Sequence, residues 1–218
     1  GHIVSSRGCP YDCIFCSQRI ISGKVYRYAK LERVMDELDI LINKYNQNDI
    51  IFMDDNFLVN KKRIYELCSF IVKREFHKKC SFHFQARGAS VNEDILRELK
   101  KANFIYVDFG IETASERLMK LINKQETVSD NINAVRMAKK LGFQVSATFI
   151  LGLPTETKEE RRAAYRLAKE LDIDFARFNN ATPYPGTKLY DIAEEEGTLS
   201  IEEGWANLNA CGSLVGGY

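Results

Sequence analysis

Three cysteines near the start of the chain have the residue type and spacing that metal chemistry requires. Cys9, Cys13 and Cys16 follow the pattern C-x3-C-x2-C within one short segment. A cluster of four irons and four sulfides is normally held by four cysteine thiolates. Three thiolates leave one iron with an open position, and an open position is where an exogenous ligand binds and reacts. The pattern therefore predicts an iron–sulfur cluster with one iron facing a cavity.

Two other uses of these cysteines remain open. One is a structural zinc-binding domain on an α/β scaffold, although three cysteines without a fourth ligand make a poor structural zinc site. The other is a plain electron carrier, although such proteins use a full set of cysteine ligands. Metal analysis that found zinc and no iron would favour the first of these.

The composition is that of an ordinary globular domain. The chain has 218 residues, 45% of them hydrophobic, and a net charge of +1. It can bury a core, and it carries no strong field that would attract nucleic acid or a membrane surface. No apolar run approaches the ~18 residues of a membrane helix, and the start lacks a signal-peptide pattern. Six cysteines without such a signal predict a cytoplasmic location, where thiols stay free or hold metal.

The other three cysteines do not fit the cluster pattern. Cys68 lies on an apolar helical stripe and Cys80 opens a strand, so both are expected to be structural. Cys211 lies in a glycine-rich tail and has no assigned role.

The spacing of apolar residues predicts strands and helices in alternation. Strands are expected at residues 3–6, 49–53, 81–85, 105–109, 145–151 and 175–179. Helices are expected at 31–45, 60–76, from 92, 128–142, from 157, and 188–196. Asn60, Asn92 and the pair Thr157 and Glu160 are the expected amino-terminal caps. Such alternation implies an α/β fold with a parallel sheet and helices outside it.

Polar residues follow the predicted strands at the same end of the sheet. They are Asp54, Asp55, Asn56, Gln85, Arg87, Glu112, Thr148 and the segment 179–185. Each residue alone also fits a structural role, such as capping a helix. Together with the cysteine loop they predict a site at the carboxyl ends of the strands, where parallel α/β folds place their active sites.

The motifs of this chain resemble those of the radical SAM superfamily, whose open iron binds S-adenosylmethionine (SAM). The resemblance rests on the cysteine loop and on the segments 110–115, 149–156 and 182–189, which arrive in the expected order. The last segment is similar to the Elongator/MiaB/NifB-like cores. The resemblance implies a partial (β/α)6 TIM-like barrel with parallel strands. With the segment 52–57, the chain most resembles members that carry an amino-terminal cobalamin-binding domain.

The resemblance also implies residues that bind SAM. Compared with the radical SAM coproporphyrinogen oxidases, Gln85 occupies the position of a glutamate that binds SAM. Glu112 occupies the position of a glutamine that binds SAM. Lys124 replaces an arginine that binds the SAM carboxylate. Lysine offers a single point charge instead of a planar, bidentate guanidinium. Thr148 replaces an aspartate near the ribose.

Two further positions belong to the implied SAM site. Phe15, just before the last cysteine, fits the aromatic position of the family's loop. Asp54, Asp55 and Asn56 stand where many members place Gly-Gly-Glu to meet the SAM amine. These carboxylates or nearby backbone carbonyls must then take that role.

The substrate is expected where Asp54, Asp55, Arg87, Asn179 and Tyr184 converge. Most of these residues are not needed to hold SAM, and a radical must meet its target at contact distance. Asp55 and Arg87 are the candidate catalytic residues, because a carboxylate and an arginine can orient a polar substrate or take up a proton.

The implied activity is radical chemistry. The reduced 4Fe–4S cluster would pass one electron to SAM, giving methionine and a 5′-deoxyadenosyl radical that abstracts hydrogen from the substrate. Cobalamin-dependent methylation is the expected outcome, with ring formation or rearrangement also open. The alternative is a tRNA-modifying methylthiotransferase-like or Elongator-like enzyme. The expected partners are a reductant such as flavodoxin or ferredoxin and a small-molecule, lipid or peptide substrate rather than nucleic acid.

The predicted domain organisation has one core. Residues 1–200 are expected to form the radical SAM core, and 201–218 are expected to begin a carboxyl-terminal extension. Any cobalamin-binding domain would lie upstream of Gly1.

Overall fold

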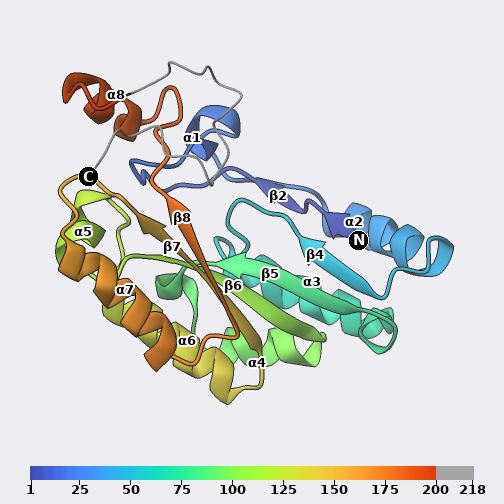
Figure 1. Cartoon of the computed structure of the whole chain (residues 1–218). Coiled ribbons are helices and arrows are strands. Elements are labelled where there is room, and N and C mark those ends of the chain that lie inside the picture. Colours follow the sequence, from blue (N-terminus) through green and yellow to red (C-terminus); the bar gives the residue numbers. More distant parts are fainter. Residues whose placement is uncertain (200–218) are drawn as a thin grey trace.

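The fold is built on one parallel sheet. A computed structural model describes residues 1–199. Its six strands pair in the order β1–β4–β5–β6–β7–β8, all parallel. Their bounds are β1 His2–Ile3, β4 Asp49–Phe52, β5 Ser81–Ala86, β6 Phe104–Glu112, β7 Gln144–Leu151 and β8 Phe175–Asn180. Helices cover one face of this sheet and leave the other face open, as in a partial barrel (Figure 1). The predicted α/β fold with parallel strands is confirmed.

The main helices connect successive strands on the covered face. They are α2 Leu31–Asp39, α3 Lys61–Lys73, α4 Glu93–Lys101, α6 Val128–Lys140 and α7 Lys158–Glu170. A further helix, α8 Lys188–Glu195, follows the last strand, β8. Two short helices, α1 Gln18–Ile21 and α5 Glu116–Leu121, flank the carboxyl ends of the strands, and neither was predicted. Short 3₁₀ turns lie at Phe76–Lys78 and Gly88–Ser90.

The predicted helix caps are present. Asn60 accepts a hydrogen bond from the third backbone N–H of α3, and Asn92 does the same for α4. Thr157 and Glu160 form the expected capping box of α7, in which each side chain bonds the other residue's backbone. These bonds satisfy orphan N–H groups at the helix starts.

Phenylalanines fill the space between the sheet and the helices. Phe52, Phe57, Phe82, Phe84 and Phe104 are fully or almost fully buried, and their contacting ring centroids lie 5.0 to 6.0 Å apart. Such pairs contribute about 0.5–1.5 kcal/mol each beyond area burial. Since side chains alternate along a strand, this packing turns the intervening residues to the open face.

Several boundaries differ from the prediction. The first strand ends at Ile3, and Ser6–Arg7 forms β2 of a small antiparallel hairpin with β3 Arg27–Tyr28. The helix expected to reach residue 45 becomes a π-helix over Ile40–Lys44. The predicted extension 201–218, with Cys211, lies outside the described residues. None of the helices within 1–199 combines the length and hydropathy that crossing a bilayer requires.

Candidate active site

The cysteine loop is anchored at the carboxyl ends of the strands. Gly8 has φ +92°, and a Cβ there would lie 2.3 Å from the carbonyl oxygen of Val25, so only glycine fits this close approach. The N–H of Gly8 donates to Asp55 Oδ2 at 2.6 Å. Further along, the N–H of Ile14 donates to the carbonyl of Ile122 at 3.0 Å. The loop that carries the cysteines is thus tied to β4 and to the end of α5.

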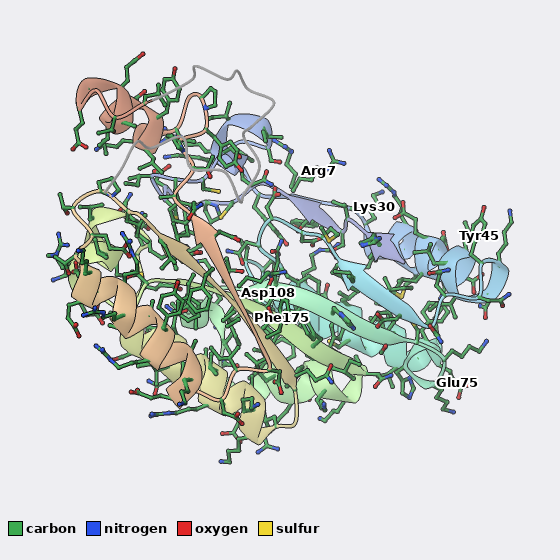
Figure 2. All side chains as sticks on the ribbon, viewed as in Figure 1. Arg7, Lys30, Tyr45, Glu75, Asp108 and Phe175 are labelled. Atoms are coloured by element: carbon green, nitrogen blue, oxygen red, sulfur yellow. The ribbon has the colours of Figure 1, made fainter. Side chains whose placement is uncertain are left out.

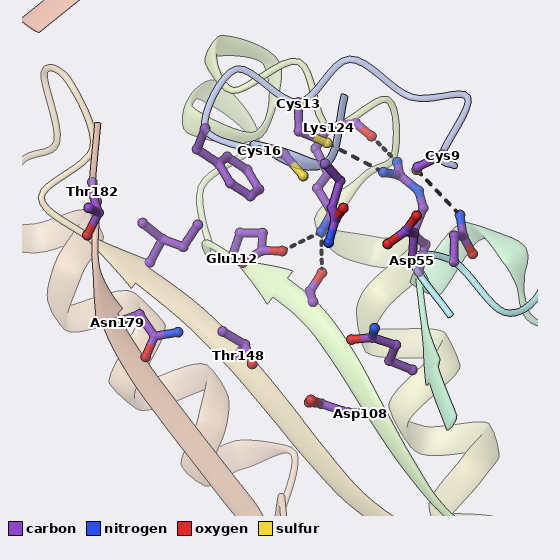
Figure 3. Close-up of a pocket in the computed structure, with 18 of the residues that line it drawn as sticks. Cys9, Cys13, Cys16, Asp55, Asp108, Glu112, Lys124, Thr148, Asn179 and Thr182 are labelled. Carbon is purple, nitrogen blue, oxygen red and sulfur yellow. Dashed lines mark hydrogen bonds and ion pairs between the residues drawn. The ribbon is translucent and has the colours of Figure 1, made fainter. Parts of the chain in front are cut away.

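All three cysteines line one cavity of about 400 Å³ between this loop and the open face of the sheet (Figure 3). Many of the other lining residues are those predicted from the sequence. They are Phe15, Asp55, Asn56, Gln85, Arg87, Glu112, Lys124, Thr148, Asn179 and Tyr184. The structure therefore brings the predicted residues together from the ends of five strands and the cysteine loop.

Asp54 is the exception, and the prediction that its carboxylate reaches the site is wrong. The side chain is fully buried and does not line the cavity. Its oxygens accept hydrogen bonds from the N–H of Ser5 at 2.6 Å, from Ser5 Oγ at 2.7 Å and from Ser6 Oγ at 2.5 Å. The carboxylate points to the chain between β1 and β2 because three donors converge on it there. Its backbone carbonyl accepts a hydrogen bond from Gln85 Nε2 at 2.9 Å.

Glu112 and Lys124 form a buried ion pair beside the cysteines. Lys124 Nζ lies 2.6 Å from Glu112 Oε1 and donates to the carbonyl of Gly110 at 2.7 Å. A Cβ on Gly110 would lie 2.5 Å from Glu112 Oε1 and 2.9 Å from Lys124 Nζ, so the pair occupies the space a side chain would need. Glu112 adopts φ +65°, an unusual value for a non-glycine residue. Burial lowers the pKa of Lys124, but Glu112 and Glu126 outweigh it, so the pKa lies above its ordinary value and the lysine stays charged.

Arg87 is engaged with the cysteine loop. Its guanidinium lies 3.7 Å from the ring centroid of Tyr11, and Nη1 lies 3.6 Å from Cys13 Sγ. Nη2 donates to the backbone carbonyl of Lys124. The residue is buried. These contacts use the donors that orienting a substrate would need, so the geometry favours a role in positioning the loop over the expected catalytic one.

Glu126 completes this network and was missed by the sequence analysis. Its side chain is fully buried, 3.7 Å from both Arg87 Nε and Lys124 Nζ. It lies in a loop before α6 with no motif around it, so only the spatial contact reveals it. Burial raises the pKa of the Cys13 thiol, and the nearby Lys124 and Arg87 oppose that rise. Burial also raises the pKa of Cys16.

The thiols do not converge on a single point. Within residues 1–199, no three His, Cys, Asp or Glu side chains come close enough to hold one metal ion. A four-iron cluster binds each thiolate through a different iron, so its ligands surround it at a distance from one another. Asn56 Nδ2 lies 4.0 Å from Cys9 Sγ and adds a weak donor there. Cys68 and Cys80 are buried away from the cavity, and burial raises the pKa of each to about 12, as expected of structural thiols.

Asp108 on β6 (Figure 2) also lines the cavity and was not predicted from the sequence. Its ion-pair partner, Arg177, is not among the residues that line the cavity. Arg177 on β8 forms an ion pair with Asp108 on β6. Its guanidinium also contacts the hydroxyl of Thr148, on the strand between them. The signal for Asp108 was present in the alternation along β6, since Asp108 is flanked by the buried Val107 and Phe109.

Comparison with known proteins identifies relatives of this chain. The family model "Radical SAM superfamily" matches residues 3–168. An uncharacterized methyltransferase of Pyrococcus horikoshii is 42% identical over 88% of this chain and 42% of its own length. An anaerobic magnesium-protoporphyrin IX monomethyl ester cyclase of Cereibacter sphaeroides is 32% identical over 88% of the chain and 31% of its own. The chain thus spans less than half the length of these relatives.

A solved structure has a similar fold. The radical S-adenosylmethionine methyltransferase TsrM from Kitasatospora setae, with cobalamin and a 4Fe–4S cluster bound, superposes with a TM-score of 0.80. The match covers 92% of this chain and 40% of that one at 22% identity.

Proposed function

Because this chain belongs to the radical SAM superfamily, we propose that it is the core of an enzyme in which Cys9, Cys13 and Cys16 hold a 4Fe–4S cluster and the adjoining cavity holds SAM. The observation that carries the proposal is the opening of all three thiols into one cavity beside a buried ion pair. When bound, the cluster and SAM supply one-electron chemistry in which the sulfonium is reductively cleaved. The protein contributes binding, orientation and exclusion of competing reactions.

The donor set fits both groups. Three thiols on one loop match a cluster with one iron open to a ligand. A cavity of about 400 Å³ lies within the range that encloses small ligands. SAM carries a carboxylate, an amine and a ribose diol, which need a cation and acceptors.

Specific residues take these roles in our proposal. Lys124, kept charged by its carboxylate neighbours, binds the SAM carboxylate, and Glu112 accepts from the ribose hydroxyls. Arg87 orients the loop through Cys13.

We further propose that the intact protein is a cobalamin-dependent methyltransferase or a ring-forming enzyme. Support comes from the relatives named as a methyltransferase and a cyclase, and from the fold shared with a cobalamin-bound methyltransferase. Residues 1–200 would then be the catalytic core. The cobalamin-binding domain would lie upstream of Gly1, and 201–218 would begin a further region. We propose that Asp55, Asn179 and Tyr184, which line the cavity and are not assigned to SAM, contact the substrate.

Anaerobic reconstitution tests the core of this proposal. Iron and sulfide analysis with electron paramagnetic resonance should detect one 4Fe–4S cluster in the wild-type chain and none in Cys9→Ala. Cys68→Ala is the matched control, because it removes a buried thiol outside the cavity and should retain the cluster. A complete cluster in Cys9→Ala, or zinc without iron in the wild type, would contradict the proposal.

Calorimetric titration with SAM tests the second part. Lys124→Met should weaken SAM binding about 10- to 100-fold, the scale of a lost charge-assisted hydrogen bond. Cluster content should not change. Unchanged affinity in both Lys124→Met and Glu112→Ala would remove these two assignments and leave the cysteine assignment intact.

A further inference from the structure

Glu126 carries a carboxylate just outside the lining of the cavity, and none of the proposed contacts with SAM or the cluster involves it. Its side chain is fully buried. Oε2 lies 3.7 Å from Arg87 Nε, and Oε1 lies 3.7 Å from Lys124 Nζ. Both of these cations line the cavity, and Arg87 contacts the Cys13 thiol. One buried anion therefore faces the two cations of the site.

A cradle of neutral donors holds this carboxylate in place. The N–H of Ala89, in the turn Gly88–Ser90, donates to Oε2 at 3.3 Å. Nδ2 of Asn131, a fully buried residue of α6, donates to Oε1 at 3.3 Å. A Cβ on Gly88 would lie 2.6 Å from Asn131 Oδ1 and 2.8 Å from Asn131 Cα, so only glycine lets the turn pack this closely on α6. The position of the carboxylate thus does not depend on the two cations.

The distances to the two cations indicate an effect of charge rather than of hydrogen bonding. A separation of 3.7 Å exceeds the length of an N–H···O bond, and Arg87 Nε is buried without a hydrogen-bond partner among residues 1–199. Arg87 is held instead by Tyr11 and by the backbone carbonyl of Lys124. Lys124 Nζ is held by Glu112 at 2.6 Å. Coulomb attraction falls only as the inverse of distance, so at this separation it keeps about three quarters of its strength at hydrogen-bond length.

We propose that Glu126 is a fixed counter-charge that keeps the reduction potential of the cluster low. With Glu126 the buried network has two positive and two negative charges, and without it one cation is left uncancelled. Net charge near an iron–sulfur cluster is one of the factors that set its potential. Reduction adds a negative charge to the cluster, so an uncancelled cation would favour the reduced form and make that form a weaker reductant. The inference rests on the proposed function, because it concerns the cluster of the same site.

Anaerobic redox titration of the reconstituted full chain without SAM, followed by electron paramagnetic resonance, tests the inference. Glu126→Gln keeps the shape of the side chain and removes its charge. At the wild-type midpoint potential, its ratio of reduced to oxidised cluster should be at least about tenfold higher, which is a positive shift of about 59 mV for one electron. Glu126→Asp keeps the charge and should return most of the shift. Glu160→Gln is the control and should leave the potential unchanged, because it removes a carboxylate that pairs with Arg117 outside the cavity.

A double variant separates a counter-charge from an anchor. Arg87→Met with Glu126→Gln removes one charge of each sign, so its potential should lie near that of the wild type and above that of Arg87→Met. Because it leaves no uncancelled cation, it also replaces Glu126→Gln if thermal melting shows that the single variant does not fold. If Glu126 only anchored Arg87, the double variant would match Arg87→Met, and Glu126→Gln would shift the potential downward. Either result, or an unchanged potential in Glu126→Gln, would overturn the inference.

Cluster content measured on the same samples separates this inference from the proposed function. A wild-type chain that assembles no 4Fe–4S cluster contradicts the proposed function. A wild-type chain that assembles the cluster, with a potential that does not respond to Glu126→Gln, contradicts the inference alone.

Discussion

The two neighbouring aspartates after β4 provide a sharp test of how this site is built. Asp54 is fully buried and accepts three hydrogen bonds from Ser5 and Ser6. Asp55 lines the cavity and accepts one, from the N–H of Gly8. We expect Asp54→Asn to lower stability strongly and Asp55→Asn to lower it little. The two changes are chemically identical and adjacent in sequence.

The magnitude follows from the donors left without an acceptor. In Asp54→Asn the amide oxygen can still accept, but the amide nitrogen replaces the other oxygen, so about one or two of the three buried donors lose their partner. Each costs about 1–3 kcal/mol, which gives a loss of roughly 3 kcal/mol. For a protein of this size, 1 kcal/mol corresponds to about 2–4 °C, so Tm should fall by roughly 6–12 °C. Asp55→Asn keeps an acceptor for Gly8 and should lose no more than about 1 kcal/mol.

Thermal melting followed by circular dichroism measures the stability, and SAM titration of the reconstituted protein measures the site. Asp54→Asn should bind SAM with wild-type affinity at temperatures well below its Tm, because its side chain does not reach the cavity. Either of two results would refute this expectation: a Tm of Asp54→Asn equal to that of the wild type, or a loss of SAM affinity in Asp54→Asn while it remains folded.

Two further predictions concern charges outside that pair. Arg87→Met should retain the cluster but make its reduction potential more negative, because a cation that contacts Cys13 Sγ favours the more negatively charged, reduced state of the cluster. Redox titration followed by electron paramagnetic resonance measures this potential. Arg87→Lys should recover part of the shift. Hydrogen bonds, first from Arg117, lower the pKa of Glu160 to about 2. The folded pKa lies below the ordinary value, so this carboxylate stabilises the fold above pH ~4.5, and the stabilisation is lost as the pH falls toward ~2. Unfolding of Glu160→Gln should therefore depend less on pH in that window, and an unchanged dependence would contradict the assignment.

Local patterns predicted the parts of the molecule that local forces determine. Asn60, Asn92 and the pair Thr157 and Glu160 cap helices as expected, because capping depends on residues three positions apart. The cysteine loop and most of the polar residues after the strands also converge on one cavity as expected. Parallel strands connected by helices leave little freedom in where their carboxyl ends meet.

The sequence could not predict which way side chains turn once a strand has ended. Asp54 and Asp55 have similar neighbours in sequence, but only the fold brings Ser5 and Ser6 beside the first of them. Contacts between distant segments were equally hidden. The Asp108–Arg177 pair joins residues 69 positions apart, and nothing in either strand names its partner.

The buried charges beside Cys13 argue for function rather than stability. Arg87, Lys124, Glu112 and Glu126 lie within 4 Å of one another in a chain of contacts, with two positive and two negative charges. Replacing such a buried network by well-packed apolar residues is often neutral or stabilising, so folding alone does not require it. Its geometry nevertheless depends on local structure that is costly to keep: a glycine at position 110 whose missing side chain makes room for the pair, and a positive φ at Glu112. Strain and buried charge are thus retained at the same place. They lie beside the Cys13 thiol, which would carry negative charge as a metal ligand. A site that must hold cations beside a cluster requires this arrangement.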